Sequence, residues 1–503
     1  MEFWCIAMNR FKVAIVGAGI IGASIARVLS MYENFDVVLI DKELDVGWGV
    51  SKANTSIIHP CHEEDPERHP LRAKLCMEGN KIWREWSKEL DIPIKWPGEL
   101  MVFHNSDEEK EVRKYIWFAI KNGVPGVRIV YRDELQSFEQ NINPDAIGAL
   151  YAPSAGTLSP FEAVIAIVEN AVDNGVKLLV DTNVLSVKIR NNVVIGIETS
   201  KGFIEADIAI NAAGLYADYI SHTAGVAKDF WIKPRRGEYI VFDEDVDIKP
   251  VKILHTTPTP LTKGVYAITT VHGNLMIGPT AEDLPIDAKE NKATSENGYS
   301  YLIKEGEKLL RKLPPLSKVI RRFAGLRPEP PNGDWLIDVY IDPWGFINVA
   351  GIRSPGLTAA PAIAKYVLDL MVKKYEINLV KKRSWNCYRV GIKGIRNLNI
   401  YEADKLIKRN PGYGKVICYC KIVTEAEINE AIDRILKIGA RPTIDGIKFR
   451  TTACFGKCQG SFCRWEIALI LSKKLGVPLH KVIVRKSSYG IGDIKVLLRG
   501  ESN

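Results

Sequence analysis

The first strongly patterned stretch of the chain alternates short apolar runs with one amphipathic segment. Residues 11–43, FKVAIVGAGIIGASIARVLSMYENFDVVLIDKE, predict a strand, a glycine-rich turn, a helix and a second strand, which together form a βαβ unit. Residues 177–214 predict short strands joined by turns, and residues 231–330 predict an antiparallel sheet. A late strand at 346–352 runs into a predicted helix. The order predicts an α/β (α+β) fold in which one sheet collects separated parts of the chain and a second sheet is interleaved with it.

The turn after the first strand carries three glycines, Gly17, Gly19 and Gly22, in the spacing G-x-G-x-x-G. This spacing permits a tight turn, lets the backbone approach a pyrophosphate, and lets the helix pack on the strand. Asp41 ends the second strand, where a carboxylate can accept hydrogen bonds from ribose hydroxyls. We therefore predict an adenine dinucleotide site in this unit.

A long polar loop, residues 44–75, follows the βαβ unit. A nicotinamide-binding domain would usually continue here with further strand-helix units, so the interruption bears on which dinucleotide is bound. Ser51, Asn54 and Thr55 supply hydroxyl and amide groups that can line a cofactor, and His59 follows an apolar pair.

Composition places the chain among ordinary globular proteins. It has 503 residues, 46% of them hydrophobic and 25% charged, which suggests about three folding units. The net charge of +8 is spread among acidic residues, which argues against nucleic-acid binding and favours a small anionic substrate or an acidic redox partner, with a merely solvated surface as the alternative. We find no transmembrane segment or secretory signal and expect a cytoplasmic protein, in which the residues before Met8 are an extension or follow an early start codon.

Five of the nine cysteines fall within residues 418–463. In a reducing compartment this clustering indicates metal ligation rather than disulfides. The isolated cysteines are interpreted as ordinary thiols; they are Cys5, Cys61, Cys76 and Cys387.

A separate C-terminal domain is predicted to begin after PGYG at 411–414, because basic residues of weak periodicity precede it as a connection. Thr424 and Glu427 have the spacing of a capping box ahead of an apolar helical stripe. The ligand candidates form C-x-C and C-x4-C patterns; they are Cys418, Cys420, Cys458 and Cys463. Four thiolates from two loops suit an iron–sulfur cluster, and a structural zinc site is the alternative.

Several stretches together resemble FAD-dependent oxidoreductases of the D-amino-acid oxidase (DAO) type, and among them glycerol-3-phosphate dehydrogenases. The glycine triplet, INAAG and GIRSPGLT carry the resemblance to the superfamily, and SKANTSIIHP, PRRGEY, GNLMIGPTAED and GLRPE carry that to the narrower branch. L-2-hydroxyglutarate oxidases share much of the second set. VICYCKIVTEAEI with GKCQGSFC resembles the bacterioferritin-associated-ferredoxin-like (BFD-like) [2Fe-2S] domain.

The resemblance implies an FAD-binding Rossmann-like domain with an interleaved antiparallel-sheet substrate domain, plus a small helical iron–sulfur domain at the C-terminus. The implied bounds are an oxidoreductase at 8–385 (FAD-binding parts about 8–80, 150–220 and 320–385, substrate parts about 81–149 and 221–319), a linker at 386–410 and a BFD-like domain at 411–503.

The resemblance also assigns cofactor residues. Around the FAD it implies Gly17, Gly19, Ile21, Gly22, Asp41, Lys42, Ser51, Asn54, Thr55, Val184, Ala213, Gly214, Gly351, Arg353, Gly356, Leu357 and Thr358. Four of them, Gly351, Gly356, Leu357 and Thr358, would present backbone amides at a helix N-terminus to the part of the flavin where negative charge develops on reduction. In the BFD-like pattern Cys454 is a nearby thiol rather than a ligand.

Oxidation of a secondary alcohol requires a general base, and a phosphate monoester requires cationic partners. His59 is the first candidate for the base, although Pro60 and Cys61 replace the glycines usual after it, and His272 is the second. The candidates for the phosphate are Arg327, Arg353 and Lys263. A purely structural role is the alternative for each, and it is the interpretation we adopt for Arg235 and Arg236.

These assignments predict oxidation of sn-glycerol 3-phosphate to dihydroxyacetone phosphate, with hydride transfer to FAD N5. Electrons would continue through the [2Fe-2S] cluster to an external acceptor protein or a quinone-linked partner. The alternatives are the same machinery acting on L-2-hydroxyglutarate or an amino acid of the proline or sarcosine type, an electron-transfer subunit of a larger complex, and a zinc-stapled binding module. Peripheral membrane association, oligomer or hetero-complex formation, covalent attachment of the flavin and the terminal acceptor stay open at this point.

Overall fold

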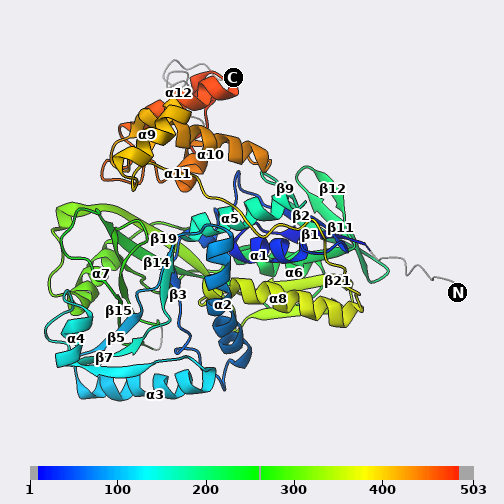
Figure 1. The fold of residues 1–503 in the computed structure, drawn as a ribbon. Helices are drawn as coiled ribbons and strands as arrows, with labels where there is room; N and C mark the ends of the chain where they lie inside the picture. Colours follow the sequence, from blue (N-terminus) through cyan, green and yellow to red (C-terminus); the bar gives the residue numbers. More distant parts are fainter. Residues whose placement is uncertain (1–9, 260–261, 487–503) are drawn as a thin grey trace, which may run out of the picture. The chain divides into compact units, whose positions relative to one another are not determined.

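The computed structural model describes residues 10–259 and 262–486 and separates into two compact units (Figure 1). The first unit contains the chain up to Asp41, Gly47–Lys177 and Thr182–Arg389. The second contains Lys42–Val46, Leu178–Asp181 and the chain from Val390 onward. Two regions that carry predictions lie outside the described residues; they are the start of the chain with Cys5 and Met8, and the end of the predicted C-terminal domain, residues 487–503.

The first sheet of the first unit has a parallel centre, in the order β10-β11-β21-β13-β1-β2, with β12 beside β11 and β20 beside β21. The strands of this sheet are β1 (Phe11–Val16), β2 (Phe35–Ile40), β10 (Val184–Arg190), β11 (Val193–Thr199), β12 (Gly202–Glu205), β13 (Ile208–Asn211), β20 (Leu336–Ile341) and β21 (Trp344–Ala350). The chain also forms the short strand β9 (Lys177–Leu179). The central strands are continuous apolar runs because both faces are covered.

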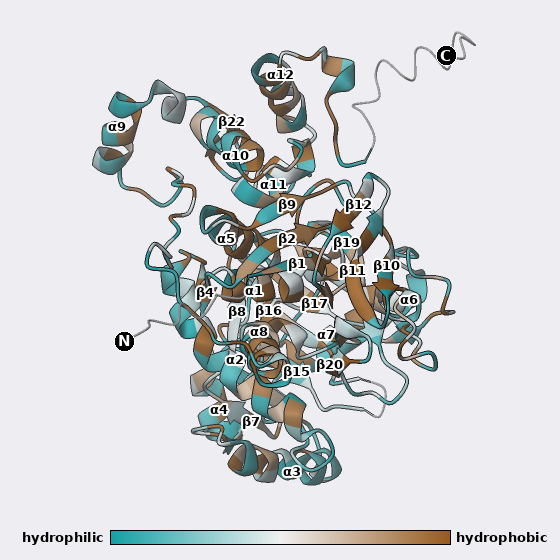
Figure 2. Cartoon of the chain, turned by 90° about the vertical axis from the view of Figure 1, so that its right-hand side faces the viewer, coloured by the Kyte–Doolittle hydropathy of each residue, from teal (hydrophilic) through white to brown (hydrophobic). Residues whose placement is uncertain are grey.

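Helices cover this sheet. They are α1 (Ile20–Leu29), α5 (Pro160–Asp173), α6 (Ala217–Thr223) and α8 (Gly356–Tyr375). Helix α1 packs against both α5 and α8, and α2 (Pro70–Glu89) packs on α8. The last contact needs a glycine, because a Cβ at Gly79 would lie 2.1 Å from the carbonyl oxygen of Thr358. Apolar residues gather on the strands and on the helices next to them (Figure 2).

The second sheet runs in the order β18-β14-β17-β16-β15-β5-β7-β6, with β19 beside β14. Its strands are β5 (Glu99–Phe103), β6 (Arg128–Tyr131), β7 (Gly148–Ala152), β14 (Lys233–Phe242), β15 (Ile253–Thr256), β16 (Tyr266–Thr269), β17 (Leu275–Gly278), β18 (Glu282–Asp283) and β19 (Val319–Glu329). Neighbouring strands of this sheet are antiparallel, as predicted, except that β5 and β15 run parallel. Strand β19 pairs with β14 along its length, so the part assigned to FAD binding from about residue 320 contributes instead to the second sheet as far as Glu329.

A small third sheet and three further helices complete the first unit. The sheet joins β3 (Ile57–Ile58), β8 (Gly156–Leu158) and β4 (Ile94–Lys95). The helices are α3 (Ser106–Asn122), α4 (Arg132–Phe138) and α7 (Glu296–Leu309). No helix within the described ranges has the length and apolar character needed to cross a membrane.

The second unit is mainly helical. Its elements are α9 (Ile400–Arg409), β22 (Val416–Cys418), β23 (Val423–Thr424), α10 (Glu425–Lys437), α11 (Ile444–Thr451) and α12 (Cys463–Leu475). The capping box predicted for Thr424 and Glu427 is confirmed at the start of α10, where both reciprocal hydrogen bonds form. Helix α9 lies within the segment predicted as a linker and has its own capping box, from Asn399 and Glu402.

The short segment Lys42–Val46 belongs to the second unit through a buried ion pair. Arg450 donates to the two carboxylate oxygens of Asp45 at 2.5 and 3.0 Å, and each side chain is only 1% exposed. Both groups lose water, so the bidentate geometry is what makes their burial tolerable.

Candidate functional site

The glycine turn lies where the parallel strands of the first sheet end. Val16 pairs with Ile40 on one side and with Asn211 on the other, so the residues after these strands meet at one edge. Gly17 has φ +104°, and a Cβ there would lie 2.4 Å from the carbonyl oxygen of Ala212. The turn therefore excludes a side chain at this position, as the sequence pattern required.

Other predicted cofactor residues reach the same edge. Gly214 follows β13, and a Cβ built on it would meet nothing within 4 Å, which indicates open space. Gly351 follows β21, and α8 begins at Gly356. Ligands of open α/β sheets bind at the carboxyl ends of the strands, so this edge fits a dinucleotide. Val184, predicted near the adenine, begins β10.

Polar groups already organise the turn. The carboxylate of Asp41 accepts the N–H of Ala18 at 2.8 Å, and the Ser51 hydroxyl accepts the N–H of Ile20 at 2.9 Å. The loop after Ser51 is held by Asn54, which donates to the Ser51 carbonyl at 2.8 Å. Thr55 lies 3.4 Å, oxygen to oxygen, from the Tyr239 hydroxyl. Lys42, by contrast, falls in the segment that belongs to the second unit.

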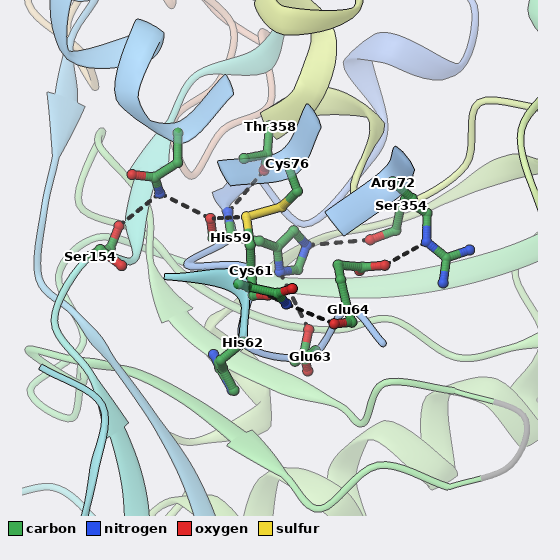
Figure 3. Close-up of a disulfide and its surroundings, with 12 residues drawn as sticks. His59, Cys61, His62, Glu63, Glu64, Arg72, Cys76, Ser154, Ser354 and Thr358 are labelled. Atoms are coloured by element: carbon green, nitrogen blue, oxygen red, sulfur yellow. Dashed lines mark hydrogen bonds and ion pairs between the residues drawn. A yellow bond between two sulfur atoms is a disulfide. The ribbon is translucent and has the colours of Figure 1, made fainter. Parts of the chain in front are cut away.

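His59 is fixed between the loop after β3 and the start of α8 (Figure 3). Its backbone N–H donates to Thr358 Oγ1 at 2.9 Å, its Nε2 lies 3.3 Å from Ser354 Oγ, and its Nδ1 lies 3.6 Å from Glu63 Oε2. Burial lowers the pKa of His59, and Lys263 lowers the pKa further, while nearby carboxylates oppose both effects. The imidazole is therefore neutral near pH 7, which is the state that can accept a proton.

Two buried carboxylates beside His59 are neutralised by two cations. Lys263 Nζ contacts Glu64 Oε1 and lies 3.3 Å from Glu63 Oε2, and Arg72 Nε lies 2.5 Å from Glu64 Oε2. Burial raises the pKa of each carboxyl group, but Lys263 and the neighbouring histidines His255, His59 and His62 together outweigh it and lower the pKa of Glu63 to about 2. Lys263 and Arg72 likewise lower the pKa of Glu64 to about 2. Both carboxylates are therefore ionised at neutral pH. Removal of Lys263 would leave the Glu63 carboxylate buried without a cationic partner among the described residues.

The candidate arginines Arg353 and Arg327 both lie within electrostatic reach of Glu329. Arg353 Nε lies 2.9 Å from Glu329 Oε1 in an ion pair, and Arg353 donates to the carbonyl oxygen of Gly333 at 3.0 Å. Arg72 donates to the same carbonyl at 2.9 Å. Arg327 donates to the Thr280 carbonyl at 2.5 Å. Burial lowers the pKa of Arg327, and Tyr239 and the same Glu329 carboxylate oppose this effect. Arg327 Nε is buried and makes no hydrogen bond with the described residues. A buried guanidinium N–H without an acceptor suits an anionic ligand.

The structure thus brings His59 and Lys263 together and connects them through Arg72 to Arg353. His272, the second candidate for the base, contacts other residues: its Nε2 lies 3.3 Å from Glu162 Oε1, and its ring stacks on Phe161.

Arg235 and Arg236 form ion pairs within the second sheet, as a structural role requires. Arg235 lies 2.5 Å from Asp283, and Arg236 lies 2.6 Å from Glu282.

The interpretation of Cys61 and Cys76 as ordinary thiols is wrong. Their sulfurs form a disulfide, with the Cα atoms 5.9 Å apart, which ties the loop of His59 to α2 (Figure 3). The two cysteines are 15 positions apart in the sequence, and the packing of the loop against α2 brings them together. The expectation of thiols in a reducing compartment gave no reason to pair them.

Sequence reasoning also missed Glu63, Glu64 and Arg72. Their signal was the dense charged run HEEDPERHPLR directly after His59 and Cys61. Such a run usually forms a solvated surface, but here Glu63 and Glu64 point inward and are only 3% and 1% exposed.

In the second unit five sulfurs gather between β22 and the start of α12. Cys420 Sγ lies 3.6 Å from Cys458 Sγ, and Cys454 Sγ lies 3.5 Å from Cys463 Sγ. Tetrahedral thiolate sites with bonds of about 2.3 Å separate their sulfurs by about 3.8 Å, so the spacing fits a metal centre. Cys418 ends β22 next to this group. A Cβ at Gly456 would lie 2.2 Å from Cys420 Cβ, so the loop closes on the sulfurs only without a side chain there.

Comparison with known proteins agrees with this geometry. The model of the FAD dependent oxidoreductase (DAO) family matches residues 12–370. The chain belongs to that family. The model of the BFD-like [2Fe-2S] binding domain matches residues 416–473. The chain is therefore an oxidoreductase with FAD and a [2Fe-2S] cluster as cofactors, and both cofactor predictions are confirmed.

Three relatives illustrate the likeness. The chain is 40% identical over 472 residues to a protein of Caloramator mitchellensis named glycerol 3-phosphate dehydrogenase, covering 94% of this chain and 96% of that one. It is 31% identical to glycerol 3-phosphate oxidase of Mycoplasma genitalium, covering 75% and 98%. The solved structure of L-alpha-glycerophosphate oxidase from Mycoplasma pneumoniae with FAD bound has a TM-score of 0.69 at 28% identity, covering 76% and 99%. The predicted mixed α/β fold and the resemblance are confirmed.

Proposed function

We propose that this protein oxidises sn-glycerol 3-phosphate to dihydroxyacetone phosphate and passes the electrons from FAD through the [2Fe-2S] cluster to an external acceptor. The observation that carries the proposal is the neutral, buried imidazole of His59 beside Lys263, with guanidinium groups nearby. Relatives named for glycerol 3-phosphate support the choice of substrate. The cytoplasmic location stays a prediction.

His59 takes the role of general base in this proposal. The Thr358 hydroxyl holds its backbone N–H, and the Ser354 hydroxyl and Glu63 carboxylate lie on its two ring nitrogens. These contacts set the orientation of the ring, and the lowered pKa keeps it free of a proton until the substrate hydroxyl supplies one. The Glu63 carboxylate can then stabilise the imidazolium that forms.

The phosphate dianion is assigned to Arg327 and Arg353. Arg327 Nε lacks an acceptor among the described residues, and Arg353 is held by Glu329 and the Gly333 carbonyl. Bound FAD supplies the acceptor site for the substrate hydride at N5. The edge of glycines and the first turn of α8 would hold it, with Thr358 linking that turn to His59.

The thiolates assigned to the cluster are Cys418, Cys420, Cys458 and Cys463. A cluster is a one-electron carrier, so it can divide the electron pair and deliver the electrons singly.

The test is an anaerobic substrate screen on the purified protein. Glycerol 3-phosphate should bleach the flavin absorbance and produce the paramagnetic signal of the reduced cluster. L-2-hydroxyglutarate, proline and sarcosine should leave the flavin oxidised at the same concentration. Bleaching by one of these three and not by glycerol 3-phosphate would overturn the substrate assignment.

Arg327→Ala should weaken substrate binding while the protein keeps its FAD and its yellow colour. Arg128→Ala is the matched control, because Arg128 forms an exposed ion pair with Glu134 on the second sheet. Equal saturation behaviour of the two variants would remove Arg327 from the site.

A further inference from the structure

In addition to the groups assigned above, three further polar side chains meet in the core of the first unit. His62 lies in the loop after β3, Glu99 begins β5, and His255 lies on β15. All three are 0% exposed. His62 Nδ1 lies 3.5 Å from Glu99 Oε1, and His255 Nε2 lies 3.7 Å from the same oxygen. One ligand atom of each residue lies within 4.8 Å of the other two.

Strand register explains why Glu99 and His255 face each other. Strands β5 and β15 run parallel, and Glu99 is the partner of Ile253. His255 is two positions beyond Ile253, so its side chain returns to the face that carries Glu99. His62 reaches this face from the adjoining loop, and its ring points away from the disulfide (Figure 3).

These groups lack the hydrogen bonds that buried polar groups normally have. All four ring nitrogens of the two histidines, His62 and His255, are buried without a hydrogen bond to any described residue. The same is true of both carboxylate oxygens of Glu99. Leaving buried polar atoms unsatisfied costs about 1–3 kcal/mol for each group. Such a cluster is stable when one bound ion or molecule interacts with the unpaired nitrogen and oxygen atoms of all three side chains.

Aromatic rings restrain the two imidazoles. His255 stacks on Tyr266 with ring centroids 4.6 Å apart, and His62 meets Tyr115 edge-on at 6.1 Å. The nitrogens are therefore directed by packing, as ligands of a preformed site are.

We propose that His62, Glu99 and His255 bind a divalent transition-metal ion of the zinc type. Ligand bonds of about 2.1 Å in a tetrahedral site separate neighbouring ligand atoms by about 3.4 Å, which agrees with the spacing around Glu99 Oε1. Two imidazoles and one carboxylate are typical zinc and iron(II) ligands, whereas calcium and magnesium prefer oxygen alone. A water molecule would complete the site.

The ion has a positioning role. His62 is three residues from His59, so a metal bond would fix the loop of the proposed base to two strands of the second sheet. The disulfide ties the same loop to α2, and the metal would restrain it from the other side.

The test uses full-length protein with its [2Fe-2S] cluster in place, so that the cysteine thiolates are occupied. After treatment with a chelator that leaves the cluster signal unchanged, the protein is titrated with Zn²⁺ and the bound metal is measured by mass spectrometry. One equivalent should bind, and X-ray absorption at the zinc edge should show nitrogen and oxygen ligands without sulfur. Sulfur ligands, or no uptake by the protein, would overturn the proposal.

Near-isosteric variants give the second arm. Glu99→Gln and His62→Gln should each weaken Zn²⁺ binding by about 100-fold. His104→Gln is the matched control, because His104 Nδ1 also lies 3.5 Å from a carboxylate, that of Glu108, at a partly exposed position. FAD content and circular dichroism establish that each variant is folded. If folded Glu99→Gln or His62→Gln binds zinc as tightly as His104→Gln, the ion is not held by this cluster.

Discussion

Replacing Lys263 by methionine removes the main cation from a buried group of charges. Glu63 and Glu64 both have a pKa of about 2 in the folded protein, against an ordinary value of 4.5. The interval corresponds to about 3 kcal/mol of stability for each carboxylate. Arg72 still neutralises Glu64 in the variant, but Glu63 keeps no lysine or arginine partner among the described residues. Its direct contacts are then His59 at 3.6 Å and the Tyr266 hydroxyl at 3.3 Å.

We therefore expect Lys263→Met to lower the free energy of unfolding at pH 7 by about 3 kcal/mol, at the lower end of the range for breaking a buried ion pair. The pH dependence has a definite sign. A carboxylate with a depressed pKa stabilises the fold fully above about pH 4.5 and loses this contribution as the pH falls towards 2. The difference between wild type and variant should accordingly shrink below pH 4.5.

The assay is guanidinium chloride unfolding followed by tryptophan fluorescence at pH 7 and pH 4. Lys263→Met/Glu63→Gln should recover most of the loss, because it removes the carboxylate left without a cation. Lys318→Met is the control, since Lys318 pairs with Asp245 at 2.9 Å on the surface, where water screens the ion pair, and this substitution should lower the free energy of unfolding far less than Lys263→Met. Equal losses for Lys263→Met and Lys318→Met, or no recovery in the double variant, would refute the reasoning.

Three further outcomes follow from the site. Cys76→Ala should lower the unfolding free energy by about 3 kcal/mol, because the disulfide closes a 15-residue loop, and a reductant should lower the melting temperature of the wild type but not of this variant. Cys420→Ser should abolish the paramagnetic signal of the reduced cluster, whereas Cys454→Ser should keep it. A loss of signal in Cys454→Ser would show that the fifth sulfur, 3.5 Å from Cys463, is a ligand. His59→Gln should slow anaerobic flavin reduction by about 10²–10⁴-fold. Because burial lowers the pKa of His59, the wild-type rate should stay constant as the pH is lowered to 6.5 and fall only below it. A wild-type rate that already begins to fall at a pH above 7 as the pH is lowered would contradict the assignment.

Features written in consecutive residues could be predicted from the sequence. The glycine turn between β1 and α1, the capping box of Thr424 and Glu427, and the clustered cysteines each combine a local pattern with one physical requirement. Gly214 and Gly351 follow strands of the same parallel sheet, and this alone places both glycines at the edge formed by the carboxyl ends of the strands.

Features that depend on distant residues meeting could not be predicted in the same way. Lys263 pairs with carboxylates about 200 positions earlier, and the disulfide partner of Cys61 depends on how α2 packs. The parallel pairing of β5 with β15 joins segments that hydrophobic alternation alone cannot align, and it is this pairing that brings Glu99 beside His255. Composition and periodicity carry no information on such long-range register.

The buried pair of Asp45 and Arg450 means that the cluster-binding unit is not encoded by one uninterrupted stretch of the gene. A fragment starting at Val390 would lack the strand-end segment that supplies Asp45, and its Arg450 would have to lose water without a counter-ion. Transplanting this electron carrier to another flavoprotein would therefore require grafting residues 42–46 and 178–181 along with the tail.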